Sequence, residues 1–136
     1  MLMNRSLSRE MAFLLLFEYV IKGDESAEEI FENAVEYPNF KESPYTKHIF
    51  FGTIENFKAV SEVVDNCLKG WKKERISYVS RAILYLSTFE MMSVEDVPYK
   101  VAIDEAVDLS KKYDDEKTYT FINGVLNAVA EALDLK

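Results

Sequence analysis

The side chains best suited to chemistry in this sequence are aromatic and basic residues near the C-terminus. Lys117 and Thr118 come shortly before Phe121. Phe121 lies one position from Ile122, where an apolar stripe begins, so it is displaced by about 100° around a helix from that stripe. At the edge of a core, such a ring can stack on an unpaired base while lysines meet phosphates. It can equally complete the packing, and the pattern leaves both interpretations open.

A second group of basic residues surrounds the single tryptophan, Trp71. It consists of Lys69, Lys72, Lys73 and Arg75. Basic and aromatic residues in one short stretch are typical of a nucleic-acid-binding patch. We favour the simpler interpretation, a solvated loop in which Trp71 is anchored in the core.

No arrangement of residues indicates an enzyme, a metal site or a cofactor site. The four glycines stand apart from one another, which excludes a glycine-rich phosphate loop. His48 and Cys67 are the single histidine and the single cysteine, so neither a zinc cluster of these residues nor an internal disulfide can form. We therefore expect no catalytic residue, no bound metal and no cofactor.

Composition bounds the domain count and the compartment. The 136 residues fit a single domain, 1–136, and the apolar run Met11–Phe17 is too short to cross a bilayer. No signal peptide is evident, so we expect a cytoplasmic protein that does not contact a membrane.

The net charge is −8, and most of it comes from the seven acidic residues between Asp24 and Glu42. Strong non-specific binding to nucleic acid is therefore not expected.

Helical periodicity and capping signals predict an all-α bundle without strands. We expect the longest helix, 43–68, to bend near Gly52. We expect the apolar helix 77–92 to lie at the centre of the bundle. The glycine of Asn123-Gly124 costs about 1 kcal/mol within a helix. We expect a close helix crossing, or a hydrogen bond from Asn123 to a loop, to offset that cost. The predicted helices are 4–22, 26–38, 43–68, 77–92, 98–113 and 118–133.

Four stretches, in order along the chain, resemble the NusB transcription antitermination family. Residues 94–113 resemble its signature helix, and residues 121–126, Phe-Ile-Asn-Gly-Val-Leu, resemble its closing motif. The other two stretches resemble the central helix and the opening of the first helix. They are Arg81-Ala82-Ile83-Leu84 followed by Phe89-Glu90, and Arg9-Glu10-Met11-Ala12 with Leu16-Phe17.

The resemblance implies a bundle of two packed three-helix halves and a non-catalytic, RNA-binding adaptor. Such a protein acts with the ribosomal small-subunit protein NusE and binds boxA RNA in ribosomal RNA leader transcripts. With other Nus factors, it supports processive elongation by RNA polymerase, which it contacts indirectly. Whether the chain is a monomer or a homodimer stays open.

The resemblance also implies a set of RNA-binding residues. The arginine-rich N-terminus of the family is reduced here to two arginines, Phe17 stands where many members have tyrosine, and Asp114 stands where a small residue is common. The few arginines and the net negative charge favour one alternative, a helical interaction module that binds a NusE-like partner without significant RNA binding. The RNA-binding residues are expected to be Arg5, Arg9, Phe17, Lys117, Thr118 and Phe121.

Overall fold

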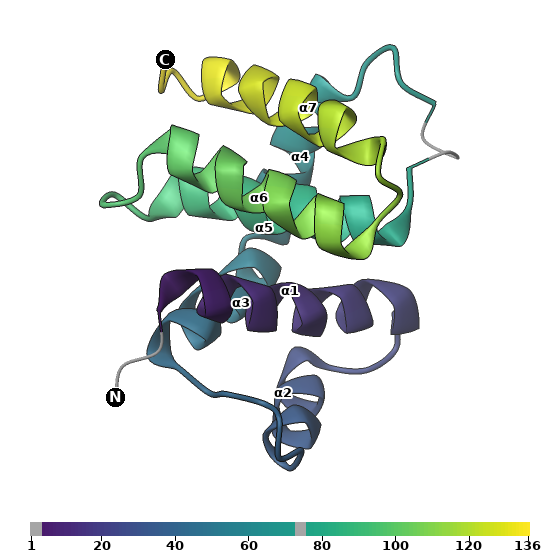
Figure 1. The fold of residues 1–136 in the computed structure, drawn as a ribbon, viewed down its shortest axis with the longest axis vertical. Helices are drawn as coiled ribbons and strands as arrows, with labels where there is room; N and C mark the ends of the chain where they lie inside the picture. The colour runs from purple at the N-terminus through teal and green to yellow at the C-terminus, as the bar shows by residue number, and fades with distance from the viewer. Residues whose placement is uncertain (1–3, 73–75) are drawn as a thin grey trace.

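The computed structural model describes residues 4–72 and 76–136, and in these two ranges every regular element is a helix (Figure 1). The expected all-α class is therefore confirmed. None of the helices in the described ranges has the length and apolar character needed to cross a membrane. The helices are α1 (Arg5–Lys22), α2 (Ala27–Val35), α3 (Pro44–Glu55), α4 (Phe57–Cys67), α5 (Tyr78–Ser93), α6 (Tyr99–Tyr113) and α7 (Thr118–Ala132).

The helices form two packed groups, with α1, α2 and α3 in one and α4 to α7 in the other (Figure 1). Helix α5 joins the groups, because it packs against α1 and α3 on one side and against α4, α6 and α7 on the other. Most of its side chains are buried, which agrees with the predicted central position of this segment. Its buried apolar residues belong to a core cluster that also includes residues of the six other helices.

Polar residues begin four of the helices where the sequence predicts a start. The side chains of Asn4, Ser26, Ser43 and Ser77 each accept a hydrogen bond from the backbone N–H three residues later. Each bond satisfies an N–H group that has no partner within the helix. Gly23 ends α1 with a φ of +70°, a conformation that glycine adopts at little cost.

The predicted helix 43–68 is divided into α3 and α4, and the break lies at Asn56 rather than near Gly52. The Asn56 side-chain amide donates to the carbonyl of Gly52 at 2.8 Å, and its backbone leaves helical geometry at φ −108° and ψ 24°. Asparagine side chains compete in this way with the helical hydrogen-bond pattern. Gly52 instead permits close packing of α3 on α5, since a Cβ there would lie 2.3 Å from Phe89 Cζ.

The expected compensation for Gly124 is absent. A Cβ at this position would meet no atom within 4 Å, so no helix crosses α7 closely here. The carbonyl of Asn123 accepts a hydrogen bond from the Asn127 amide within the same helix. Within residues 4–72 and 76–136, Asn123 has no hydrogen bond to a loop. The prediction that a close helix crossing or a hydrogen bond from Asn123 to a loop offsets the cost of Gly124 is therefore wrong.

A buried cluster of charged and polar residues connects α1 to three other helices. Arg9 of α1 is 4% exposed, and its Nε donates to Oε2 of Glu90 in α5 at 2.7 Å. Its Nη1 lies 3.3 Å from Oε1 of Glu105 in α6. The hydroxyl of Tyr45 in α3 also donates to Glu90. Burial, together with this bond to Glu90, raises the pKa of Tyr45, so the phenol keeps its proton and remains a donor.

A second polar contact joins α1 to the end of α6. Lys112 and Tyr113 both donate to the carboxylate of Glu10. Burial and the Glu10 carboxylate raise the pKa of Tyr113 to about 12, so its hydroxyl stays a donor at neutral pH. Burial alone would raise the pKa of Glu10, but the hydrogen bonds from Lys112 and Tyr113 outweigh it and lower that pKa.

The contact between Gly52 and Phe89 predicts opposite effects for two glycine substitutions. Gly52→Ala should reduce the free energy of unfolding by about 1–3 kcal/mol, because the buried Phe89 ring has little room to move away. Gly124→Ala, in open space on a helix, should leave stability unchanged or raise it by up to about 1 kcal/mol. Urea denaturation of both variants tests this, and equal effects would contradict it.

The buried cluster predicts that Arg9 contributes much more to stability than Arg5. Glu90 is only 2% exposed, and Arg9→Ala leaves its carboxylate without a cation. This change should reduce the free energy of unfolding by about 3–5 kcal/mol. Arg5 pairs with Asp96 at the surface, so Arg5→Ala should cost less than about 1 kcal/mol. Denaturation midpoints measured side by side test the difference. A loss below 1 kcal/mol for Arg9→Ala would show that the cluster does not stabilise the fold.

Candidate nucleic-acid interface

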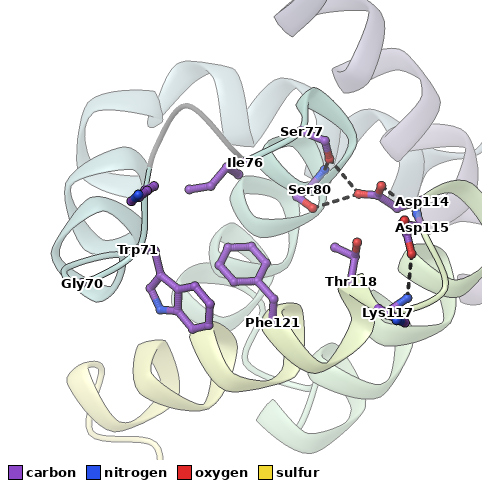
Figure 2. A pocket seen from close by; sticks show the side chains of 11 residues that line it. Gly70, Trp71, Ile76, Ser77, Ser80, Asp114, Asp115, Lys117, Thr118 and Phe121 are labelled. Carbon is purple, nitrogen blue, oxygen red and sulfur yellow. Dashed lines mark hydrogen bonds between the residues drawn. The ribbon is translucent and has the colours of Figure 1, made fainter.

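An open groove of about 900 Å³ lies between the segment after α4, the start of α5 and the turn from α6 to α7 (Figure 2). Gly70, Trp71 and Lys72 contribute from the first of these segments. Lys117, Thr118 and Phe121 contribute from the last. We call this the Trp71 groove.

Two aromatic rings form one end of the Trp71 groove. The ring centroids of Trp71 and Phe121 lie 4.7 Å apart at an interplanar angle of 74°, so the two rings meet edge to face. Trp71 is 51% exposed, and the prediction that it is anchored in the core is therefore wrong. Of its basic neighbours, Lys69 and Lys72 are exposed, while Lys73 and Arg75 lie outside the described residues.

A hydrogen-bonded carboxylate forms the other end of the groove (Figure 2). Asp114 Oδ2 accepts hydrogen bonds from the hydroxyls of Ser77 at 2.7 Å and Ser80 at 2.9 Å. Its Oδ1 accepts from the backbone N–H of Asp115, and Asp115 in turn accepts from the backbone N–H of Lys117. These bonds hold the turn between α6 and α7 against the start of α5. In the described part of the chain, no group of three or more His, Cys, Asp or Glu residues is placed to bind a metal.

The structure separates the expected RNA-binding residues into two places. Lys117, Thr118 and Phe121 lie together in the Trp71 groove. Arg5 lies at the opposite end of α6, where it pairs with Asp96 at 3.2 Å and its guanidinium sits 4.3 Å from the Tyr45 ring centroid. Because α6 is about 22 Å long, one nucleotide cannot contact both places.

Arg9 and Phe17 differ in accessibility from the other expected residues. Arg9 is enclosed by Glu90, Glu105 and Tyr45, so no phosphate reaches its guanidinium, and the structure assigns it a stabilising contact instead of an RNA contact. Phe17 is half-buried and packs on the Phe13 ring at a centroid distance of 6.1 Å. Its role in RNA binding stays a prediction.

Sequence reasoning did not find that Trp71, Ser77, Ser80 and Asp114 share one groove with Phe121. These residues come from three separate segments that meet only when α5, α6 and α7 pack together. The one available signal was the cluster of basic and aromatic residues around Trp71, which we interpreted as a solvated loop.

Comparison with known proteins identifies the family. The sequence model of the NusB family matches residues 6–131. A transcription antitermination protein NusB from Clostridium botulinum (strain Kyoto / Type A2) is 41% identical over 140 residues, covering 91% of this chain and 97% of that protein.

Solved structures agree with the sequence comparison. The T. maritima NusB structure superposes with a TM-score of 0.85 at 29% identity, covering 96% of this chain and 93% of that one. A chain from a crystal structure of the antitermination factors NusB and NusE in complex with dsRNA gives a TM-score of 0.83 at 30% identity, covering 94% and 96%. The family match spans nearly the whole chain and the same helical fold recurs in these structures, so this chain belongs to the NusB family.

Proposed function

We propose that this chain is a transcription antitermination factor that binds boxA-type RNA of ribosomal RNA leader transcripts together with NusE. In this role it supports processive elongation by RNA polymerase, acting with other Nus factors in the cytoplasm. Residues 1–136 act as one domain. The observation that carries the proposal is the Trp71 groove, in which the exposed ring of Trp71, the partly buried ring of Phe121 and exposed lysines are combined in a member of the NusB family.

The groove and Arg5 supply complementary kinds of RNA contact. Trp71 and Phe121 offer ring surfaces on which an unpaired base stacks, and Lys117 offers a cation for a neighbouring phosphate. Arg5 is exposed, and its surface pair with Asp96 is weak enough to be exchanged for a phosphate. The RNA strand therefore extends along α6 from Arg5 to Phe121.

The charge distribution supports a role for the protein partner. The net charge is −8, Arg9 is buried, and Asp96 already neutralises Arg5, so the chain alone attracts RNA weakly. A partner that adds basic surface next to the bound strand would supply the missing attraction. One of the similar solved structures contains NusB, NusE and dsRNA together, which supports NusE as that partner.

The same charges favour one alternative, a protein-interaction module that binds a NusE-like partner without significant RNA binding. Under this alternative, the Arg5–Asp96 pair persists and the groove has no role in RNA binding. The two functions differ in whether the complex binds RNA more tightly than the partner alone.

Titration of labelled boxA RNA tests the proposal. We expect weak binding by the chain alone and tighter, salt-sensitive binding by the equimolar complex with NusE, since counterion release dominates phosphate contacts. Fluorescence anisotropy at several salt concentrations measures both, with NusE alone as the control. A stable complex that binds RNA no better than NusE alone would establish the alternative function.

Removing each partner of the Arg5–Asp96 pair should change RNA affinity in opposite directions. Arg5→Ala should weaken binding for all RNA sequences and reduce the slope of log K against log salt by about 0.7, the value for one phosphate on a single strand. Asp96→Asn releases Arg5 from its competing carboxylate and should strengthen binding at low salt. The same anisotropy assay, with NusE present, measures both variants. Unchanged slopes would show that Arg5 does not contact phosphate.

A further inference from the structure

A chain of hydrogen bonds runs along one end of the Trp71 groove, from the start of α5 to the start of α7 (Figure 2). Its central residue is Asp114, whose Oδ2 accepts from the hydroxyls of Ser77 and Ser80. The other oxygen, Oδ1, accepts from the backbone N–H of Asp115, which in turn accepts from the backbone N–H of Lys117. Both carboxylate oxygens of Asp114 are thus already used to hold two segments of the chain together.

The α5 end of these bonds is fixed within the helix. Ser77 is the N-cap residue of α5, and its oxygen accepts from the backbone N–H of Ser80 at 3.0 Å while its proton is directed to Asp114. Ser80 is 1% exposed, so its hydroxyl would be costly to leave without an acceptor. The two serines therefore favour one position of the Asp114 carboxylate.

The α7 end depends on these bonds, because α7 lacks a capping side chain of its own. Lys117 is the N-cap residue of α7, and its side chain makes no capping hydrogen bond. Asp115 accepts from its backbone N–H instead, and Asp115 is itself bonded to Asp114. Ile122 anchors the body of α7 in the core, whereas the bonds of Asp114 fix the turn that leads into the helix. Lys117 and Phe121, which line the groove, lie in or next to this first turn.

We infer that Asp114 is a positioning residue for RNA binding, which holds Lys117 and Phe121 in the arrangement that the Trp71 groove offers to a nucleotide. Because these side chains are already held in place, they lose little conformational freedom when RNA binds, and the cost of ordering them is reduced. This inference rests on the proposed RNA binding and adds the residue that prepares the groove for it. Asp114 acts through the turn and makes no contact with RNA in this role.

The charge of Asp114 and its positioning role predict opposite effects on RNA binding. A carboxylate near Lys117 repels phosphate, so removal of its charge alone should strengthen binding. Removal of the hydrogen bonds should weaken binding instead, because the first turn of α7 then has to be ordered by the RNA. Glu116 is the matched control for charge, since it is exposed in the same turn and makes no hydrogen bond or ion pair within the described residues.

Anisotropy of labelled boxA RNA, added to the complex of the chain with NusE, measures the first effect. Asp114→Ala should weaken binding roughly two- to ten-fold, the range for ordering one side chain on association. Glu116→Gln should strengthen binding or leave it unchanged. Asp114→Asn keeps an oxygen for the two serine hydroxyls and should lie between the wild type and Asp114→Ala. Ser80→Ala should also weaken binding, but it should add little to Asp114→Ala, because both changes remove the same bond.

Trp71 gives a second readout in the chain alone, because it is the only tryptophan in the sequence and its ring meets Phe121. Asp114→Ala should loosen Phe121 from Trp71 and raise the acrylamide quenching constant of Trp71 fluorescence. Gly52→Ala is the control for stability, since it acts through Phe89 outside the groove. It should change neither the quenching constant nor RNA affinity, even where its urea midpoint falls as far as that of Asp114→Ala.

The outcomes distinguish this inference from the proposed function. If Asp114→Ala strengthens RNA binding as much as Glu116→Gln does, Asp114 acts only through its charge and the inference is wrong. If Asp114→Ala matches Gly52→Ala in both quenching and RNA affinity, Asp114 serves stability alone and the inference is also wrong. The proposed function stands in both cases. If the wild-type complex binds no RNA, the proposed function fails and the inference fails with it.

Discussion

The buried ion pair between Arg9 and Glu90 is the interaction on which the arrangement of this fold depends. A guanidinium and a carboxylate that are both almost fully enclosed must each be paired, because an unpaired charge in the interior costs several kcal/mol. Glu105 and Tyr45 complete the pairing from α6 and α3. Because these charges must be paired, α1 is fixed in one position along α3, α5 and α6. Apolar contacts alone would specify this position less strictly.

This fixed register determines which cations remain available at the surface. With Arg9 inside, Arg5 comes to lie beside Asp96 and over Tyr45, and Lys112 is held by Glu10. The basic residues near α1 are therefore largely neutralised within the molecule. The Trp71 groove lies at the other end of α6, where the bonds of Asp114 to the start of α5 shape it. The half-exposed ring of Trp71 and the exposed Lys72 and Lys117 of the groove thus lie away from Arg5 and Arg9.

Local signals predicted the helices well, and the errors about burial and exposure come from residues whose partners are distant in sequence. The caps at Ser26, Ser43 and Ser77 were predictable because the bonded groups are three residues apart. The break at Asn56 was missed because its side-chain bond to Gly52 competes with an otherwise regular helical pattern. Arg9 was expected to contact RNA, because Glu90 and Glu105, the acids that enclose it, are distant from it in the sequence.

The sequence by itself determined the helical class, most helix boundaries and the family resemblance, because periodicity, capping and motifs depend on residues close together in the chain. Only the tertiary structure decided which charges are buried and which rings are exposed. Glu90 and Arg9 are 81 residues apart, and Trp71 meets Phe121 only because α7 packs across the segment that follows α4. Accessibility is a property of the packed helices, so the place of the candidate site could not be determined from local patterns.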